Sequence, residues 1–326
     1  MIKVGLIGCG FMGDMHANCY KNLAGVKIAA VADVRREKAL ELSSGADCEI
    51  YADGKELIEK ADVDVIDICL PTYLHAEYAI LAMDKVKYLF VEKPVALNNE
   101  QAAAMIEKSV KTGCNVQVGQ VIRFWDEYVE LKNVVESGKY GKVINANFRR
   151  LSPRPTWGWN SWLLDDKLSG GAAQDLHVHD TDYVLSLFGA PEKIYSAKNV
   201  IGEKNSYINT IMMYKDFTVT VEGTWDLPST RPFEATFRVV FEKATLENAG
   251  GKFMLYTESG AEEVKIEKKK LSGSVEGGNV SDLGGYYNEL LYFTDKAKAG
   301  EKIEKATLKD AAKSLEFVLG EISFNA

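Results

Sequence analysis

Two histidines near the middle of the chain, His177 and His179, lie among carboxylates and could transfer protons. They belong to the segment GGAAQDLHVHDTD, which begins at Gly170. A histidine titrates near neutral pH, and a neighbouring carboxylate can orient its ring and stabilise its charged form. Which of the two has such a carboxylate depends on whether the segment forms a helix or a strand.

We expect a helix over residues 172–188. The segment has no internal glycine or proline and is bounded by glycines at both ends, which are start and stop signals of a helix. Positions i, i+4 and i+7 share one helix face, so Asp175, His179 and Asp182 lie together and His177 points elsewhere. His179, oriented by Asp175, is therefore the expected proton-transfer residue, and His177 is expected to pack in the scaffold.

A strand is the alternative conformation of this segment. It would put His177, His179 and Asp175 on one face, a combination that resembles a metal cluster. Because the bounding glycines favour the helix, we expect no metal site.

A glycine-rich loop lies near the start of the chain, where residues 8–13 read GCGFMG. The loop follows an apolar run, opens an expected helix, and precedes Asp33 by about 20 residues, as in dinucleotide sites. We expect Gly8 to allow the tight turn, Gly10 to admit a pyrophosphate and Gly13 to let helix and strand approach. The helix start would supply unpaired N–H groups, and Asp33 would accept hydrogen bonds from ribose hydroxyls.

The residues after Asp33 affect the choice of cofactor. The carboxylate favours NAD because it would repel the 2′-phosphate of NADP. Arg35 and Arg36 follow it, and an arginine there can stack on adenine or pair a 2′-phosphate. We expect NAD and keep NADP as the alternative.

Strands and helices alternate over the first 120 residues. The expected strands are residues 4–7, 28–32, 50–51, 63–70, 88–91 and 115–118. The expected helices between them are residues 12–23, 36–43, 55–60, 75–83 and 99–112. This pattern predicts a Rossmann domain over residues 1–120, with a doubly wound parallel sheet covered on both faces.

The pattern changes after about residue 140, where longer strands alternate in polarity and follow one another across short turns. These strands are residues 143–149, 207–214, 218–225 and 233–241. They predict an α+β domain with a large, open, mainly antiparallel sheet. We assign residues 121–326 to this domain and expect it to bind substrate and mediate oligomerisation.

Composition narrows the class of protein. The 326 residues carry a net charge of −8, which opposes binding to nucleic acid or to an anionic membrane. Five cysteines form no Cys-x-x-Cys pair, as in a reduced cytosolic protein. We find neither a leader segment nor an apolar stretch long enough to span a bilayer, so we expect a cytoplasmic protein.

Several motifs together resemble the glucose-fructose oxidoreductase / inositol dehydrogenase / MocA (Gfo/Idh/MocA) family. They are the glycine loop, the segment LPTYLH at residues 70–75, Glu92-Lys93-Pro94, and Gly170-Gly171 followed by Asp175, His179 and Asp182. The resemblance implies a Rossmann domain, a second domain with an open mixed sheet, and a nicotinamide cofactor. One departure is visible, because the family's usual Thr-Pro-Asn reads Leu70-Pro71-Thr72 here.

The resemblance also implies roles for the catalytic residues. His179 would be the general acid or base at the substrate hydroxyl, Asp175 would orient the substrate or the histidine, and Lys93 would assist. Lys93 follows an expected strand, so it projects at the carboxyl edge of the parallel sheet, where such folds bind ligands. A surface lysine at a turn is the alternative, and whether Lys93 or His179 takes the proton stays open. A cis bond before Pro94 fits this turn.

Other residues are candidates for binding. The expected cofactor contacts are Gly8, Gly10, Phe11, Met12, Gly13, Asp33, Arg35, Leu70, Pro71, His75, Glu92 and Lys93. The expected substrate contacts are Gln120, Arg123, Trp162 and Tyr286. His16 and His75 are expected to be structural or to support the cofactor site from behind.

We therefore expect an NAD(P)-dependent oxidoreductase that acts on a secondary alcohol of a sugar, a cyclitol or a related polyol. An NAD-dependent glycoside hydrolase on the same fold and a non-catalytic dinucleotide sensor are the alternatives. A sheet with one uncovered face leaves apolar surface, so we expect a homodimer or homotetramer.

Overall fold

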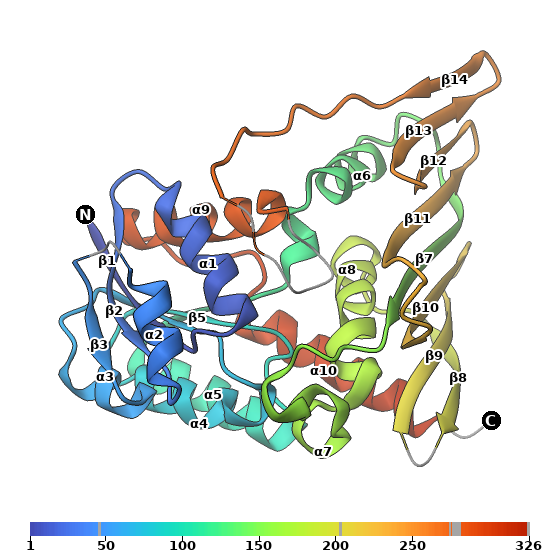
Figure 1. The fold of residues 1–326 in the computed structure, drawn as a ribbon. Helices are drawn as coiled ribbons and strands as arrows, with labels where there is room; N and C mark the ends of the chain where they lie inside the picture. Colours follow the sequence, from blue (N-terminus) through green and yellow to red (C-terminus); the bar gives the residue numbers. More distant parts are fainter. Residues whose placement is uncertain (45–46, 202–203, 274, 276–281, 325–326) are drawn as a thin grey trace. The chain divides into compact units, whose positions relative to one another are not determined.

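The computed structural model describes all residues except 45–46, 202–203, 274, 276–281 and 325–326 (Figure 1). The chain divides into two compact units. Unit 1 contains residues 1–121, 157–162 and 270–315. Unit 2 contains residues 122–156, 163–269 and 316–326. The sequence suggested one boundary after residue 120, whereas the chain returns to unit 1 twice.

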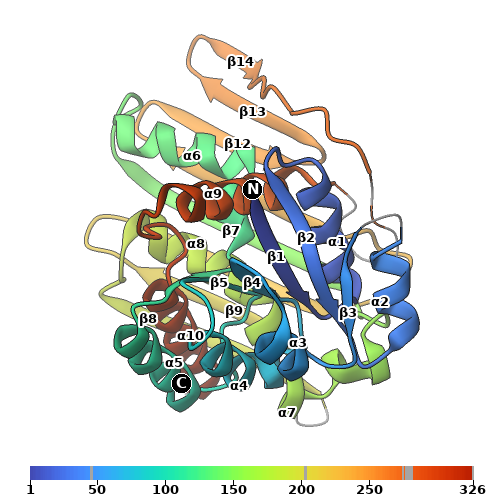
Figure 2. The same cartoon turned by 90° about the vertical axis from the view of Figure 1, so that its left-hand side faces the viewer.

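Unit 1 contains a six-stranded, fully parallel sheet (Figure 2). Its order is β3-β2-β1-β4-β5-β6, the doubly wound order of a Rossmann fold. The strands are β1 (Ile2–Ile7), β2 (Val26–Ala32), β3 (Glu49–Tyr51), β4 (Val65–Ile68), β5 (Tyr88–Val91) and β6 (Asn115–Val118). The helices between them are α1 (Phe11–Lys21), α2 (Arg36–Leu42), α3 (Gly54–Lys60), α4 (Thr72–Ala82) and α5 (Asn99–Thr112). The expected Rossmann fold is confirmed.

The order of the strands reverses between β1 and β4, which pair directly. Ligands of open α/β sheets bind at this point, outside the carboxyl ends of the strands. The loop at residues 8–13 follows β1, and residues 69–71 follow β4. The helix after β4 begins at Thr72 instead of the expected His75, because Pro71 takes the position before its first turn.

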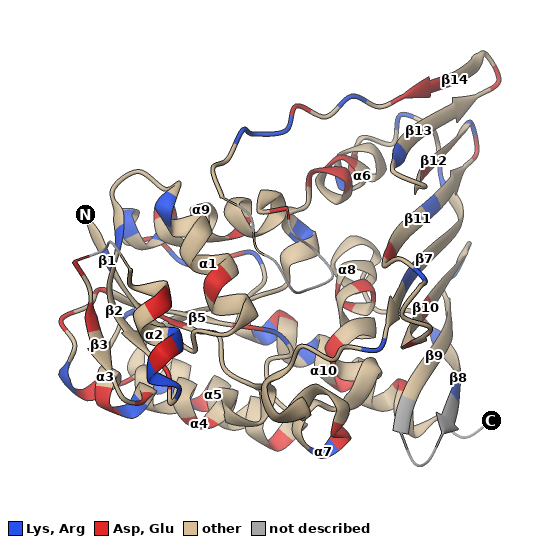
Figure 3. Ribbon diagram, in the orientation of Figure 1, with Lys and Arg blue, Asp and Glu red and all other residues tan. Residues whose placement is uncertain are grey.

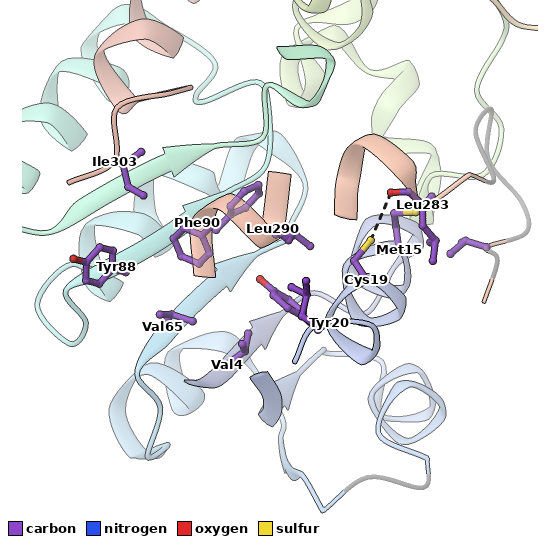
Figure 4. Packing of buried hydrophobic residues seen from close by; sticks show 13 residues of the cluster. Val4, Met15, Cys19, Tyr20, Val65, Tyr88, Phe90, Leu283, Leu290 and Ile303 are labelled. Atoms are coloured by element: carbon purple, nitrogen blue, oxygen red, sulfur yellow. Dashed lines mark hydrogen bonds between the residues drawn. The ribbon is translucent and has the colours of Figure 1, made fainter. Parts of the chain in front are cut away.

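Unit 1 is completed by a helix from far along the chain, α9 (Gly284–Ala299). Leu290 and Phe293 of this helix are buried in one cluster with Val4, Val65 and Phe90 of the parallel sheet (Figure 4). The ring of Phe293 meets that of Phe90 edge to face, with centroids 5.5 Å apart.

Unit 2 contains an eight-stranded sheet of order β14-β13-β12-β11-β7-β10-β9-β8. Its strands are β7 (Val143–Pro153), β8 (Lys193–Ile201), β9 (Lys204–Met213), β10 (Thr218–Leu227), β11 (Glu234–Phe241), β12 (Ala244–Ala249), β13 (Lys252–Thr257) and β14 (Gly260–Glu263). Only β7 and β10 pair in parallel among these strands, so the expected mainly antiparallel sheet is confirmed.

Helices cover one face of this sheet. Tyr128 of α6 (Asp126–Ser137) and Tyr183 of α8 (Val178–Phe188) contact each other and Phe148 or Phe237 of the strands. Beside them, buried Arg150 of β7 pairs with Asp180 of α8 through two hydrogen bonds. This pair satisfies two charges that would be costly to bury alone.

The remaining elements are short, apart from α10. They are η1 (Val121–Phe124), η2 (Trp159–Leu164), α7 (Asp166–Ser169), the π-helical turn η3 (Ala173–His177) and α10 (Leu308–Ser323). No helix among the described residues is long and apolar enough to cross a membrane. Acidic and basic residues are interspersed along the elements (Figure 3).

Candidate functional site

The glycine loop after β1 leaves room for a ligand. Gly8 has a φ of 97°, and a Cβ there would come within 2.5 Å of the Cys69 carbonyl oxygen. A Cβ on Gly13 would overlap the carbonyl oxygen of Gly8. A Cβ on Gly10, just before α1, would be 3.7 Å from Nη2 of Arg35, and Gly10 has no side chain to cap the helix. The loop therefore presents the N–H groups of a helix start to an anion, which fits a pyrophosphate.

The carboxylate of Asp33 stands at the end of β2. One oxygen accepts from the backbone N–H of Cys9 at 2.8 Å, so the carboxylate is tied to the glycine loop. The guanidinium of Arg35 donates to both oxygens at 3.0 to 3.1 Å. The same guanidinium lies over the ring of Trp159, 5.4 Å from its centroid. The sequence did not single out Trp159, which stands far from Arg35 along the chain.

The turn after β5 holds the expected Glu92-Lys93-Pro94 motif. Glu92 is buried, Lys93 is partly buried, and the peptide bond between Lys93 and Pro94 is cis. His75 links this turn to the end of β4, with its ring nitrogens 2.8 Å from the Pro94 carbonyl and 2.7 Å from the Leu70 carbonyl. Burial lowers the pKa of His75, while these two carbonyl contacts favour the protonated ring and oppose the shift.

Besides Oε1 of Glu92, two buried polar atoms at the same edge of unit 1 have no hydrogen-bond partner among the described residues. They are the hydroxyl of Thr72, at the start of α4, and the side-chain oxygen of Gln120, just after β6. A buried polar group normally has a partner, so each is suited to a bound ligand. Gln120 was expected to contact substrate, whereas Thr72 was not among the expected contacts.

His16 of α1 lies in a buried polar cluster of unit 1. Its Nδ1 is 2.8 Å from the carboxylate of Asp67, which also accepts a hydrogen bond from the Tyr20 hydroxyl at 2.8 Å. The sequence named His16 but missed its partners. Asp67 could have indicated this cluster, because it is an acidic residue within the otherwise apolar run of β4.

Tyr286 of α9 is also part of unit 1. Its ring lies 6.4 Å from the ring of His16, centroid to centroid. Trp162 closes the short returning segment at residues 157–162 and is partly buried. In this segment Asn160 and Ser161 have positive φ, an uncommon conformation for residues other than glycine.

The expected histidine-containing helix of unit 2 begins with the π-helical turn η3 and continues as α8. His179 is buried and Asp175 is partly buried. The carboxylate of Asp182 accepts two hydrogen bonds of 2.7 Å from the guanidinium of Arg123. Arg123, an expected substrate contact, therefore has two of its donors engaged within unit 2.

His177 lies on another side of this helix. Its ring is fully buried, with Nε2 at 3.2 Å from the carboxylate of Glu321. The ring also packs against Gly223 of β10, where an added Cβ would come within 2.8 Å of Nδ1. These contacts tie η3 to the sheet.

A Rossmann sheet with an open glycine loop and a carboxylate after β2 defines a dinucleotide-binding protein. Comparison with known proteins identifies the family to which the chain belongs. Residues 2–120 match the family described as "Oxidoreductase family, NAD-binding Rossmann fold", and residues 128–247 match the GFO/IDH/MocA C-terminal domain. The chain belongs to the GFO/IDH/MocA oxidoreductase family, and residues 2–120 match its NAD-binding Rossmann fold.

Individual relatives carry the names of inositol dehydrogenases. Myo-inositol 2-dehydrogenase of Thermotoga maritima is 31% identical over 204 residues, covering 61% of this chain and 59% of the relative. Scyllo-inositol 2-dehydrogenase (NAD(+)) of Bacillus subtilis is 28% identical over 240 residues, covering 71% and 68%. The match to the Thermotoga maritima protein thus extends over less than two thirds of that protein's length.

A solved structure matches nearly the whole chain. It is an oxidoreductase from Agrobacterium radiobacter in complex with NAD+, L-tartaric acid and magnesium. The TM-score is 0.84 at 19% identity, covering 98% of this chain and 94% of that chain. At this identity the match shows a shared fold.

Proposed function

We propose that this chain is an NAD-dependent dehydrogenase that acts on a secondary alcohol of a cyclitol, a sugar or a related polyol. The observation that carries the proposal is the turn after β5, which holds Lys93 at the carboxyl edge of the sheet that also carries the glycine loop. A dinucleotide loop and a cationic donor on one sheet edge suit chemistry at a cofactor. The names of the inositol dehydrogenase relatives support a polyol substrate.

The cofactor in this proposal is NAD, with NADP as the alternative. The carboxylate of Asp33 would accept from the ribose hydroxyls and repel a 2′-phosphate. Arg35 would exchange part of its contact with Asp33 for the adenosine. The nicotinamide supplies the hydride acceptor when it is bound, and the remaining cofactor contacts are those expected from the sequence.

Side chains of the protein have to remove the proton of the substrate hydroxyl. We assign its removal to His179, the orientation of that histidine or of the substrate to Asp175, and hydrogen-bond donation to the substrate oxygen to Lys93. A positioned acid or base of this kind contributes about 10²- to 10⁴-fold in rate. Among the expected substrate contacts, Gln120 has the best support because its side-chain oxygen lacks a partner within the described residues. Arg123, Trp162 and Tyr286 are weaker candidates.

We further propose a cytoplasmic homodimer or homotetramer. Several apolar side chains lie exposed on the face of the unit 2 sheet opposite Phe148, including Tyr195 at 50% and Ile211 at 43% exposure. A second copy would cover this face. Sedimentation or light scattering measures the assembly, and Ile211→Lys should shift it toward the monomer.

A substrate screen tests the proposed activity. Cyclitols, aldoses, sugar acids, aminosugars and glycosides are each incubated with NAD or NADP, and reduced cofactor is followed by absorbance and free sugar by chromatography. Reduction of NAD by at least one polyol supports the dehydrogenase. Release of free sugar from a glycoside without net reduction would instead identify a hydrolase, and NADH binding without any turnover would identify a sensor.

A further inference from the structure

We propose that His16 is a positioning residue for Lys93 and that it acts through the carboxylate of Glu92. The inference rests on the proposed function, in which Lys93 donates to the substrate oxygen. His16 itself is fully buried and belongs to the scaffold behind the sheet edge. Groups behind a site that orient its working residues commonly change activity 10- to 100-fold when they are removed.

A continuous set of contacts joins the two residues. Nε2 of His16 lies 3.0 Å from Oε1 of Glu92, at ion-pair distance although not as a well-aligned hydrogen bond. The other oxygen, Oε2, accepts a hydrogen bond of 3.0 Å from the backbone N–H of Lys93. The Glu92 carboxylate thus ties the buried ring to the first peptide of the turn.

The packing around Glu92 leaves its carboxylate little freedom. A Cβ on Gly119 would come within 2.9 Å of Oε1, so the backbone after β6 lies directly against the carboxylate. With His16 on one side and the Lys93 N–H on another, the carboxylate has one well-defined orientation. Glu92 can therefore transmit a change at His16 to the backbone of Lys93.

The charge state of His16 makes the link stronger. Its Nδ1 faces the carboxylate of Asp67, and its Nε2 faces that of Glu92, so both ring nitrogens are suited to carry a proton. Burial alone would lower the pKa of His16, but the charge and hydrogen bond of Asp67 raise it well above the usual value. The imidazolium ring compensates two buried carboxylates.

A metal ion is the competing interpretation of this cluster, since His16, Asp67 and Cys69 lie together. Nδ1 of His16 is 2.8 Å from Asp67, which is hydrogen-bond distance. Tetrahedral ligands of zinc, each about 2.0–2.2 Å from the ion, would stand roughly 3.4 Å apart. The geometry favours a shared proton at this contact.

A double-mutant cycle tests the inference. His16→Gln should lower kcat about 10- to 100-fold while KM and the Kd for NADH change less than about twofold. In a Lys93→Met background, the same substitution should lower kcat by no more than about twofold, because the residue through which it acts is gone. If His16→Gln does not fold, the same cycle is measured with Glu92→Gln, which keeps the size of the side chain and removes its charge.

His177→Gln is the matched control, since His177 is an equally buried histidine beside a carboxylate in unit 2. Whatever effect it has on kcat should be the same with Lys93 or Met at position 93. The rate at which an N-hydroxysuccinimide ester acylates Lys93, read by peptide mass spectrometry, should change in His16→Gln and stay constant in His177→Gln.

Two results would overturn the inference. One is an unchanged kcat in both His16→Gln and Glu92→Gln, and the other is a loss of the same size with and without Lys93. If the wild-type protein turns over no polyol, the proposed function fails, and the acylation rate of Lys93 still decides whether His16 controls this turn.

Discussion

Two histidines in this protein are fully buried beside carboxylates, His16 in unit 1 and His177 in unit 2. His16 stands between two carboxylates, and one of them, Glu92, continues to the backbone of Lys93. His177 stands beside one carboxylate, that of Glu321, and packs against a glycine of the sheet. Residue type and burial are the same at the two sites, but the elements that they connect differ.

The difference shows which property points to function. A buried ion pair by itself is weak evidence for any role, because it can be costly to the fold or neutral. His16 connects the sheet core to a turn at the carboxyl edge, where α/β folds bind ligands. His177 connects a helix start to a sheet, which holds the scaffold together. The two sites therefore differ in the element that their contacts reach, which is a ligand-binding turn for His16 and the sheet of unit 2 for His177.

The largest expected effect comes from removing the side chain of Lys93, the residue whose backbone the unit 1 contacts reach. Lys93→Met should lower kcat by about 10²- to 10⁴-fold, because the substrate oxygen loses a positioned donor. The circular dichroism spectrum and melting temperature should stay close to those of the wild type. Normal turnover by this variant would contradict a catalytic role of Lys93. His16 would then have no functional residue to position and would not differ from His177 in role.

Breaking the unit 2 site should act on stability instead. Glu321→Gln removes the charge beside His177 and weakens the contact with the Thr181 hydroxyl, at a cost of about 1–3 kcal/mol in the free energy of unfolding. Urea unfolding measures this loss. The kcat of the folded variant should stay within about twofold, and a kcat loss as large as that of Lys93→Met would contradict the scaffold role.

The pH dependence of stability tests whether the His16 ring is charged. The pKa of His16 is raised in the folded protein, so its proton stabilises the fold fully below the unfolded pKa of about 6.5. That contribution is lost as the pH rises through the folded pKa. His16→Gln should therefore cost more unfolding free energy at about pH 6 than at about pH 9. Asp67, Cys69 and Glu92 are the titratable groups that contact the ring. Tyr20 donates to Asp67, and the ring of Tyr286 lies 6.4 Å from that of His16.

Thr294→Val is a suitable control for this measurement, because the Thr294 hydroxyl is buried in unit 1, bonds a backbone carbonyl and does not titrate. Its cost should be the same at both pH values. A cost of His16→Gln that does not depend on pH would argue against an imidazolium ring.

The smallest effect is expected at Cys69. Its sulfur lies 3.3 Å from Nδ1 of His16, and burial raises the pKa of its thiol well above the usual value. A neutral thiol is a weak hydrogen-bond partner, so Cys69→Ala should change kcat by less than about twofold. Steady-state kinetics at saturating substrate tests this, and a large loss would mean that the sulfur supports His16 as strongly as Asp67 does.

Much of unit 1 follows from its sequence because the signals are local. The glycine loop, the apolar strands and the helix at residues 99–112 are all found where the pattern predicts them. In unit 2 the expected helix over residues 172–188 is found as η3 followed by α8, and the phase that separates His177 from His179 stays a prediction. These features depend on residues that are near one another along the chain.

Features that depend on distant residues could not be predicted in this way. The partner of His177, Glu321, lies at the end of the chain, and Trp159 lies more than a hundred residues from Arg35. The helix α9 and the strands that it covers are also far apart along the chain. Only the three-dimensional fold shows that it packs on Phe90 of the parallel sheet.

The return of α9 to unit 1 has a consequence for the synthesis of the protein. The buried surface around Val4, Val65 and Phe90 is completed by Leu290 and Phe293, which leave the ribosome long after the six parallel strands. Until then, the newly made N-terminal part exposes an apolar patch that favours aggregation. A fragment that ends at Val121 would expose this patch permanently, so we expect it to aggregate more readily than the longer chain.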